Sequence, residues 1–262
     1  MRIAGLSDIG LVRTKNEDAY WFDQDRAIFI LADGLGGHRA GEVAATLAVR
    51  IVADRLSLAV DCFLKEFELI DAMQEAFGVA SEEIYNHGKS TEKLSGMACS
   101  LIAGILQGEN CYLAHVGDSR GYLYFTNTLS QMTVDDTPVA ALIKRGYLLP
   151  EKARSHNLKN FLVKSIGTKR KVDANITKFP VKPGERILLC SDGLWGTLES
   201  PMMCDVLRKQ FQPEEVCRKL VNSARQKGGS DNITVIVVDV DEPTVSPNTV
   251  EMPKISESPG ES

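Results

Sequence analysis

The apolar positions of this chain fall into short continuous runs and longer stretches with helical spacing. Short runs of aliphatic and β-branched residues bounded by Gly, Asn or Asp are typical of buried strands. We therefore predict strands at residues 2–9, 18–23, 27–32, 97–106, 110–116, 119–125, 129–133, 172–180, 185–191 and 233–240. Only short turns separate the four strands between residues 97 and 133, which predicts a meander of antiparallel strands there.

Four longer segments carry apolar residues at helical spacing. This periodicity predicts helices at residues 41–60, 66–87, 201–210 and 213–227. The helices come in pairs between blocks of strands, which favours a layered fold in which helices cover the outer faces of stacked sheets. The fold class that we expect is therefore an α/β (α+β) sandwich.

Two segments depart from these patterns. Residues 135–160 are polar and contain one short helix-like stretch, Val139–Gly146. From Asp241 onward the composition shifts to Pro, Ser, Glu and Thr, with few apolar residues. Such a segment cannot bury enough apolar surface to fold. We predict one domain at residues 1–240 and a disordered tail at residues 241–262.

Composition narrows the function classes. The net charge of -5 argues against a nucleic-acid-binding protein, because phosphate binding requires a basic face. No apolar stretch is long enough to span a bilayer, so we predict no membrane association and a cytoplasmic location. The six cysteines show no C-x-x-C spacing, which is typical of core residues in a reducing compartment.

The candidate chemistry lies at the strand ends. Three predicted strands end at or just before an aspartate, namely Asp33, Asp118 and Asp192, and Asp231 precedes the last strand. Carboxylates are costly to bury, so these groups must be solvated, paired or bound to a cation. Strands that share one rim would bring them together around hard divalent ions, Mg²⁺ or Mn²⁺ rather than zinc. Ordinary turn chemistry of Asp-Gly pairs is the alternative.

The motif series as a whole resembles that of the metal-dependent Ser/Thr protein phosphatases, the type 2C or PPM family, and in particular its bacterial branch. The matching segments follow the family's order and span roughly residues 2–240. They are Arg13-x-x-Asn16-Glu17-Asp18, Asp33-Gly-Leu-Gly-Gly-His38, His115-Val-Gly-Asp118-Ser-Arg120, Cys190-Ser-Asp192-Gly193-Leu-Trp195 and Ser230-Asp231-Asn232-Ile-Thr234. The resemblance implies a central sandwich of two antiparallel β-sheets flanked by helix pairs, with a metal cluster at one end.

The resemblance also implies ligands for a Mn²⁺ or Mg²⁺ cluster. Asp33, Asp192 and Asp231 would be the catalytic carboxylates that hold two core ions, with the Gly34 carbonyl as an added ligand. Asp118, together with Asp192, would hold a third ion. A bound water activated by the metals would then attack the phosphorus, so no nucleophilic Cys or Ser is required.

Further roles follow from the same resemblance. Arg13 would hold the substrate phosphate, because its planar fork can donate two hydrogen bonds. Asp18 and Glu17 would both bind metal through coordinated waters. Asn232 would orient Asp231 from behind. A plain solvated loop is the alternative for the charged string from Arg13 to Asp18.

The activity implied is hydrolysis of phosphoserine and phosphothreonine on proteins, reversing a Ser/Thr kinase, by a monomer. A catalytically silent phosphoprotein-binding regulator and a hydrolase of small phosphate esters or nucleotides are the alternatives.

Three features depart from the family pattern or have no assigned role. Met97-Ala-Cys-Ser100 replaces a Gly-Thr-Thr strand, His38 suits a loop or capping role, and residues 135–170, the flap, are where substrate choice would reside.

Overall fold

The computed structural model describes residues 1–35, 40–62, 64–90 and 92–241. The predicted tail lies outside these ranges except for Asp241, so its boundary at residue 240 stays a prediction. His38 also lies outside the described residues. None of the helices in the described part of the chain is long and apolar enough to cross a membrane.

Two five-stranded antiparallel sheets form the centre of the fold, as the family resemblance implies. The first sheet has the order β1 (Arg2–Asp8), β10 (Ile233–Asp239), β9 (Arg186–Cys190), β6 (Arg120–Phe125) and β7 (Thr128–Gln131). The second has the order β2 (Asp18–Asp23), β3 (Ile28–Gly34), β4 (Cys99–Gln107), β5 (Asn110–Val116) and β8 (Asn175–Pro180).

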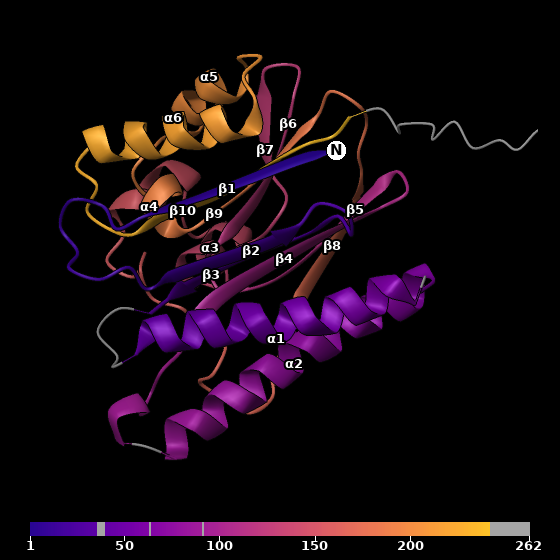
Figure 1. Cartoon of the computed structure of the whole chain (residues 1–262). Helices are drawn as coiled ribbons and strands as arrows, with labels where there is room; N and C mark the ends of the chain where they lie inside the picture. The colour runs from indigo at the N-terminus through magenta and orange to yellow at the C-terminus, as the bar shows by residue number, and fades with distance from the viewer. Residues whose placement is uncertain (36–39, 63, 91, 242–262) are drawn as a thin grey trace, which may run out of the picture.

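Helix pairs cover the outer faces of the sheets, which gives four layers (Figure 1). The pair α1 (Gly41–Asp61) and α2 (Glu66–Ser90) packs on the second sheet, and α5 (Ser200–Leu207) and α6 (Pro213–Gln226) pack on the first. The shorter helices are α3 (Pro138–Lys144), α4 (Asp192–Trp195), η1 (Glu92–Leu94) and η2 (Pro150–Ser155). The predicted sandwich class is confirmed.

Alternate residues of the central strands serve different cores. In β3, Ile28 and Ile30 pack under the helix pair α1 and α2, whereas Phe29 and Leu31 fill the space between the sheets. All four side chains are fully buried. Because both faces of the strand are covered, its sequence is a continuous apolar run rather than an alternating one.

The predicted meander between residues 97 and 133 is wrong. Strands β4 and β5 pair in the second sheet, but β6 and β7 belong to the first, and the free edge of β5 pairs with β8. The chain changes sheet at Gly117, which has φ +107°, and a Cβ there would lie 2.5 Å from Ser100 Cβ. A short connection shows that two strands are close but cannot show that they share a sheet. This crossing places Asp118 between the sheets.

Candidate metal and phosphate site

The predicted site residues gather at one end of the sandwich. Asp33 at the end of β3 lies opposite Asp18 at the start of β2 in the antiparallel register. Asp192 begins α4 directly after β9, and Asp231 precedes β10, the strand that pairs with β9. Figure 1 shows α4, the β1–β2 loop and the start of α1 together at the left of the molecule. The aspartates of distant segments thus share one rim.

Close backbone approach explains the glycine after Asp33. A Cβ at Gly34 would lie 2.5 Å from the Gly41 carbonyl oxygen and 2.6 Å from that of Glu17. The Gly34 N–H also donates to the Glu17 carbonyl, at 3.1 Å. No side chain fits there, so the start of α1 can lie directly against the rim.

Four carboxyl groups at the rim, one buried and three partly buried, carry raised pKa values. Burial, reinforced by neighbouring carboxylates, raises the pKa of Asp18 to about 7 and that of Asp118 to about 8. The same causes raise the pKa of Asp192 to about 6 and that of Asp33 well above its ordinary value. A hydrogen bond with Asp33 limits the rise at Asp192. Carboxyls crowded in this way need either protons or cations to be stable together.

Asp18 connects the two sheets across this rim. Its Oδ2 accepts a hydrogen bond from the Ser191 hydroxyl at 2.9 Å, and Ser191 Oγ in turn accepts from the Thr234 N–H at 3.0 Å. The other oxygen of Asp18, Oδ1, is buried and has no hydrogen-bond partner. A buried acceptor left without a donor is costly, and a cation would satisfy it.

Arg13 extends over the rim from the β1–β2 loop. Its Nη2 donates to Asp231 Oδ2 at 2.7 Å, and the side chain stays 42% exposed. The other oxygen of Asp231 accepts from the Asn232 backbone N–H at 2.8 Å. One exposed guanidinium therefore stands beside the carboxyl cluster, where an anion could reach it.

The Asn232 side chain holds the loop that carries Arg13. Its amide nitrogen donates to the carbonyls of Ile9 and Lys15, at 3.0 and 2.9 Å, and its Oδ1 accepts from the Glu17 N–H at 2.9 Å. Only the backbone of Asn232 touches the Asp231 carboxylate. The side chain thus orients the Arg13 loop, a role that the sequence reasoning did not assign to it.

Glu17 is partly buried at the edge of the rim. Its carboxylate lies against the start of α1, where a Cβ on Gly41 would be 2.9 Å from Oε2. Burial and the nearby Glu42 carboxylate raise its pKa. Glu42, the second residue of α1, was not among the predicted residues; one of its oxygens accepts from Lys15 at 3.3 Å.

Asp118 is not the ion-pair partner of Arg120 in the described part of the chain. Arg120, two residues further along the chain, pairs instead with Asp135, with Nη2 2.7 Å from Oδ2. The carbonyl of Asp118 accepts from the Trp195 indole N–H at 2.9 Å. Next to it, the Ser119 hydroxyl bonds to that of Ser100, the last residue of the segment Met97–Ser100 that departs from the family pattern.

The residue types at the rim suit a metal cluster, although their side chains do not form a complete set of metal ligands. In the described ranges, no three Asp, Glu, His or Cys side chains form a complete metal-ligand set. Asp231 is turned toward Arg13, and Asp18 toward Ser191, which accounts for part of this. The buried oxygen of Asp18 and the crowded carboxyls favour hard divalent cations, which prefer oxygen ligands.

We did not identify from the sequence the residues that hold the site residues in place through hydrogen bonds. Ser191 and Trp195 stand within the motif around Asp192, so their place in the sequence could have indicated a role. Asp135 and Asp136 gave no such signal, because they belong to the polar segment after β7. Asp136 accepts from the Gly117 N–H at 3.1 Å and so anchors the loop of Asp118.

Comparison with known proteins identifies the family. The family model of protein phosphatase 2C matches residues 12–232. The serine/threonine phosphatase stp of Listeria welshimeri is 34% identical over 236 residues, 89% of this chain and 93% of the relative. The crystal structure of the catalytic domain of the phosphatase PstP, in complex with two manganese ions, has a TM-score of 0.80 at 34% identity and covers 92% of this chain and 98% of that one.

A second solved structure agrees. The serine/threonine phosphatase of S. agalactiae has a TM-score of 0.85 at 32% identity, and the match covers 92% of this chain and 99% of that one. The family-model match, residues 12–232, includes every predicted site residue from Arg13 to Asn232. The chain belongs to the protein phosphatase 2C family.

Proposed function

We propose that this protein hydrolyses phosphoserine and phosphothreonine monoesters on proteins at a Mn²⁺ or Mg²⁺ cluster. The observation that carries the proposal is the crowding of four buried or partly buried carboxyls with raised pKa values beside the exposed guanidinium of Arg13. These carboxylates would bind divalent cations, and the same cations can also bind a phosphate. The relatives named above are serine/threonine phosphatases, and PstP was solved with two manganese ions.

Different groups of the chain would hold different ions. Asp33, Asp192 and Asp231 would hold the core pair, with the carbonyl of Gly34, and Asp118 with Asp192 would hold a third ion. Asp18 and Glu17 would bind through waters, which suits the spare oxygen of Asp18. When bound, the ions neutralise phosphoryl oxygens and lower the pKa of a bound water so that hydroxide is present near neutral pH.

Arg13 would position the phosphate. Its bond to Asp231 uses one of the five N–H donors of a guanidinium, so the others remain for two phosphoryl oxygens. The Asn232 side chain holds the loop of Arg13 in place before substrate arrives. An arginine that is already oriented loses less entropy on binding, which favours recognition of a planar pair of oxygens.

A cysteine nucleophile has no support at this site. Cys190 is two residues from Asp192, but it is fully buried, and this burial raises the pKa of its thiol. The thiolate is the reactive form, so such a cysteine is inert. All six cysteines are free thiols, which supports a reducing compartment and hence a cytoplasmic location. We further propose that the protein acts as a monomer on the substrates of a Ser/Thr kinase.

Steady-state kinetics with purified protein test this function. We expect Mn²⁺-dependent release of phosphate from phosphothreonine and phosphoserine peptides, and loss of that activity in EDTA. A nucleotide and small-ester panel run in parallel addresses the small-molecule alternative. Binding of phosphopeptide without any turnover in Mn²⁺ would instead identify a silent regulator, and full activity in chelator would rule out metal-assisted hydrolysis.

A further inference from the structure

The flap differs in charge from the rest of the chain. Residues 135–170 contain eight Lys or Arg and three Asp or Glu, whereas the remaining residues contain 22 and 32. The flap is therefore net positive by five in a protein whose other residues are net negative by ten. A local field of opposite sign on a protruding segment attracts anionic partners to it.

The positive charges of the flap are available to a partner. Lys144, Arg145, Lys152 and Lys159 are exposed, and among the described residues none of them forms an ion pair with an acidic group. Two of the three flap acids are already engaged, because Asp135 pairs with Arg120 and Asp136 with Asn175 and Lys164. The exposed cations are thus left uncompensated within the flap.

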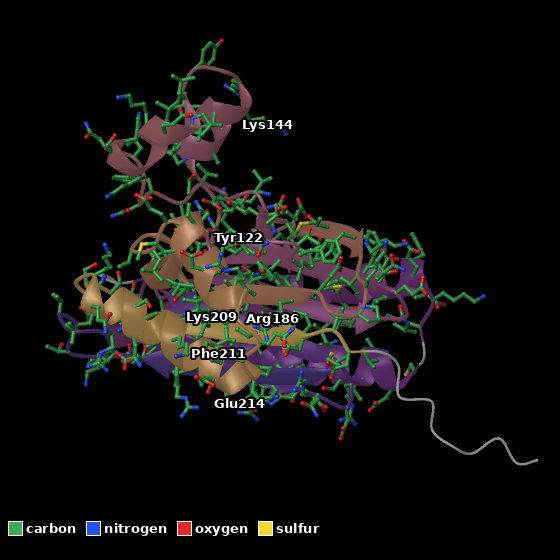
Figure 2. The ribbon with its side chains drawn as sticks, turned by 90° about the horizontal axis from the view of Figure 1, so that it is seen from above. Tyr122, Lys144, Arg186, Lys209, Phe211 and Glu214 are labelled. Carbon is green, nitrogen blue, oxygen red and sulfur yellow. The ribbon has the colours of Figure 1, made fainter. Side chains whose placement is uncertain are left out.

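The base of the flap is joined to the catalytic rim. The Asp136 N–H donates to the Gly117 carbonyl at 2.8 Å, directly before Asp118. At the other end of the flap, Ile166 forms an antiparallel bridge with Cys99, which pairs with Gly34 in the β3–β4 register. The Val163 N–H closes the base by donating to the Asp136 carbonyl at 2.8 Å. Figure 2 shows the flap, with Lys144, projecting from the body of the molecule.

A groove of about 850 Å³ lies beside α3 at this base. Apolar side chains of α3, Val163, Lys144 and Arg120 line it, together with the two engaged acids Asp135 and Asp136. On the flap itself, Tyr147, Phe161 and Val163 are large apolar residues that stay 77%, 61% and 58% exposed. Exposed apolar residues interleaved with unpaired cations are typical of a surface that binds another chain.

We propose that the flap binds an acidic segment of the phosphoprotein substrate, next to the phosphorylated residue. This inference rests on the proposed function and adds the substrate class: phosphosites flanked by Asp, Glu or further phosphates. A short acidic segment matches the size of the flap and its groove. A long polyanion or an anionic bilayer would extend beyond the flap and contact the rest of the protein surface. The net negative charge of that surface would repel either of them.

Two phosphothreonine peptides of equal length test the proposal, one with Asp and Glu flanks and one with Asn and Gln flanks. The variant that carries Lys144→Gln, Arg145→Gln, Lys152→Gln and Lys159→Gln removes the exposed flap cations. For the acidic peptide we expect kcat/KM to fall by about tenfold or more, mainly through KM, and the loss to shrink at high salt. For the neutral peptide and for 4-nitrophenyl phosphate we expect little change, since neither offers acidic flanks.

A matched control removes four exposed cations that lie outside the flap, Lys65→Gln, Lys182→Gln, Arg208→Gln and Lys209→Gln. It changes the net charge equally and should leave the preference for the acidic peptide intact. Equal kcat/KM for both peptides in the wild type would overturn the proposal, as would an equal loss in both variants. Flap-dependent sedimentation with phosphatidylserine vesicles, without a peptide preference, would make the flap a membrane surface instead. Absence of Mn²⁺-dependent turnover on every substrate would contradict the proposed function itself.

Discussion

The guanidinium carbon of Arg120 lies 3.5 Å from the centre of the Trp195 ring, while the same guanidinium pairs with Asp135. The indole N–H of Trp195 donates to the carbonyl of Asp118. One stacked pair therefore links the start of the flap, the helix that begins with Asp192 and the loop of Asp118. A cation stacked on an aromatic face and held by a bidentate carboxylate fixes all three in a single geometry.

Replacing Arg120 with Lys tests this link. Lysine keeps the charge but loses the planar fork and the stacking, so we expect the free energy of unfolding to fall by about 1–3 kcal/mol. Calorimetric titration should also show weaker binding of the Mn²⁺ ion assigned to Asp118, because its loop is less fixed. The exposed Arg55→Lys, whose ion pair with Glu75 is on the surface, serves as the control. Unchanged stability and metal affinity in Arg120→Lys would contradict a positioning role.

The core carboxylates give the largest expected effect. Asp33→Asn, Asp192→Asn or Asp231→Asn should each lower kcat on a phosphopeptide by more than about 100-fold, since each removes a charged ligand. The fold should persist, because removing a buried carboxyl also removes its desolvation cost. Circular dichroism checks the fold, and calorimetric titration with Mn²⁺ checks the loss of bound metal. A variant with near wild-type kcat would remove that residue from the cluster.

Arg13→Ala separates binding from chemistry. If the arginine contacts the phosphate equally in the ground and transition states, KM should rise by about tenfold and kcat should fall less. The variant also frees Asp231 from its ion pair, so metal affinity should not fall. Steady-state kinetics at saturating Mn²⁺ measures both parameters. A collapse of kcat at constant KM would show that Arg13 acts on developing charge, and an unchanged kcat/KM would exclude it from the site.

Asp118→Ala addresses the third ion. As a ligand of that ion, Asp118 should be required for turnover on phosphoproteins but not for the core pair, whose ligands lie on β3, on α4 and in the loop before β10. A crystal of the variant grown in Mn²⁺ should therefore contain two ions. Three occupied positions, or full turnover per folded molecule, would leave Asp118 with a turn role alone.

The metal-free protein should become less stable as pH rises. A carboxyl whose pKa is raised by folding keeps a proton that the unfolded chain releases, so the free energy of unfolding falls as pH rises through that pKa. With the pKa values of Asp192, Asp18 and Asp118 raised to about 6, 7 and 8, this loss should extend from mildly acidic pH to about pH 8. Urea unfolding in EDTA at several pH values measures it.

Saturating Mn²⁺ should reverse this trend, because ions take the place of the protons. Asp118→Asn should flatten the pH dependence in EDTA, since an amide does not titrate over this range. A stability of the metal-free wild type that rises from pH 6 to pH 8 would contradict the raised pKa values.

Local patterns were enough to predict most elements and the chemistry of the rim. Apolar runs and helical periodicity predict the strands and the two helix pairs, because each element must hide an apolar face whatever its neighbours are. The aspartates at the strand ends predict a cation site, because a buried carboxylate needs a partner. The order of the motifs then implied the family and the roles of Arg13 and Asp33.

Pairing between distant segments was decided only by the tertiary structure. No sequence pattern indicated that the chain leaves the second sheet at Gly117 and enters the first at Arg120, because a strand's apolar run is the same in either sheet. Arg120 likewise pairs with Asp135 rather than with nearby Asp118, since the crossing of the chain turns its side chain toward the flap. Sequence determined what each element must bury, and packing across the two sheets determined which charged groups meet.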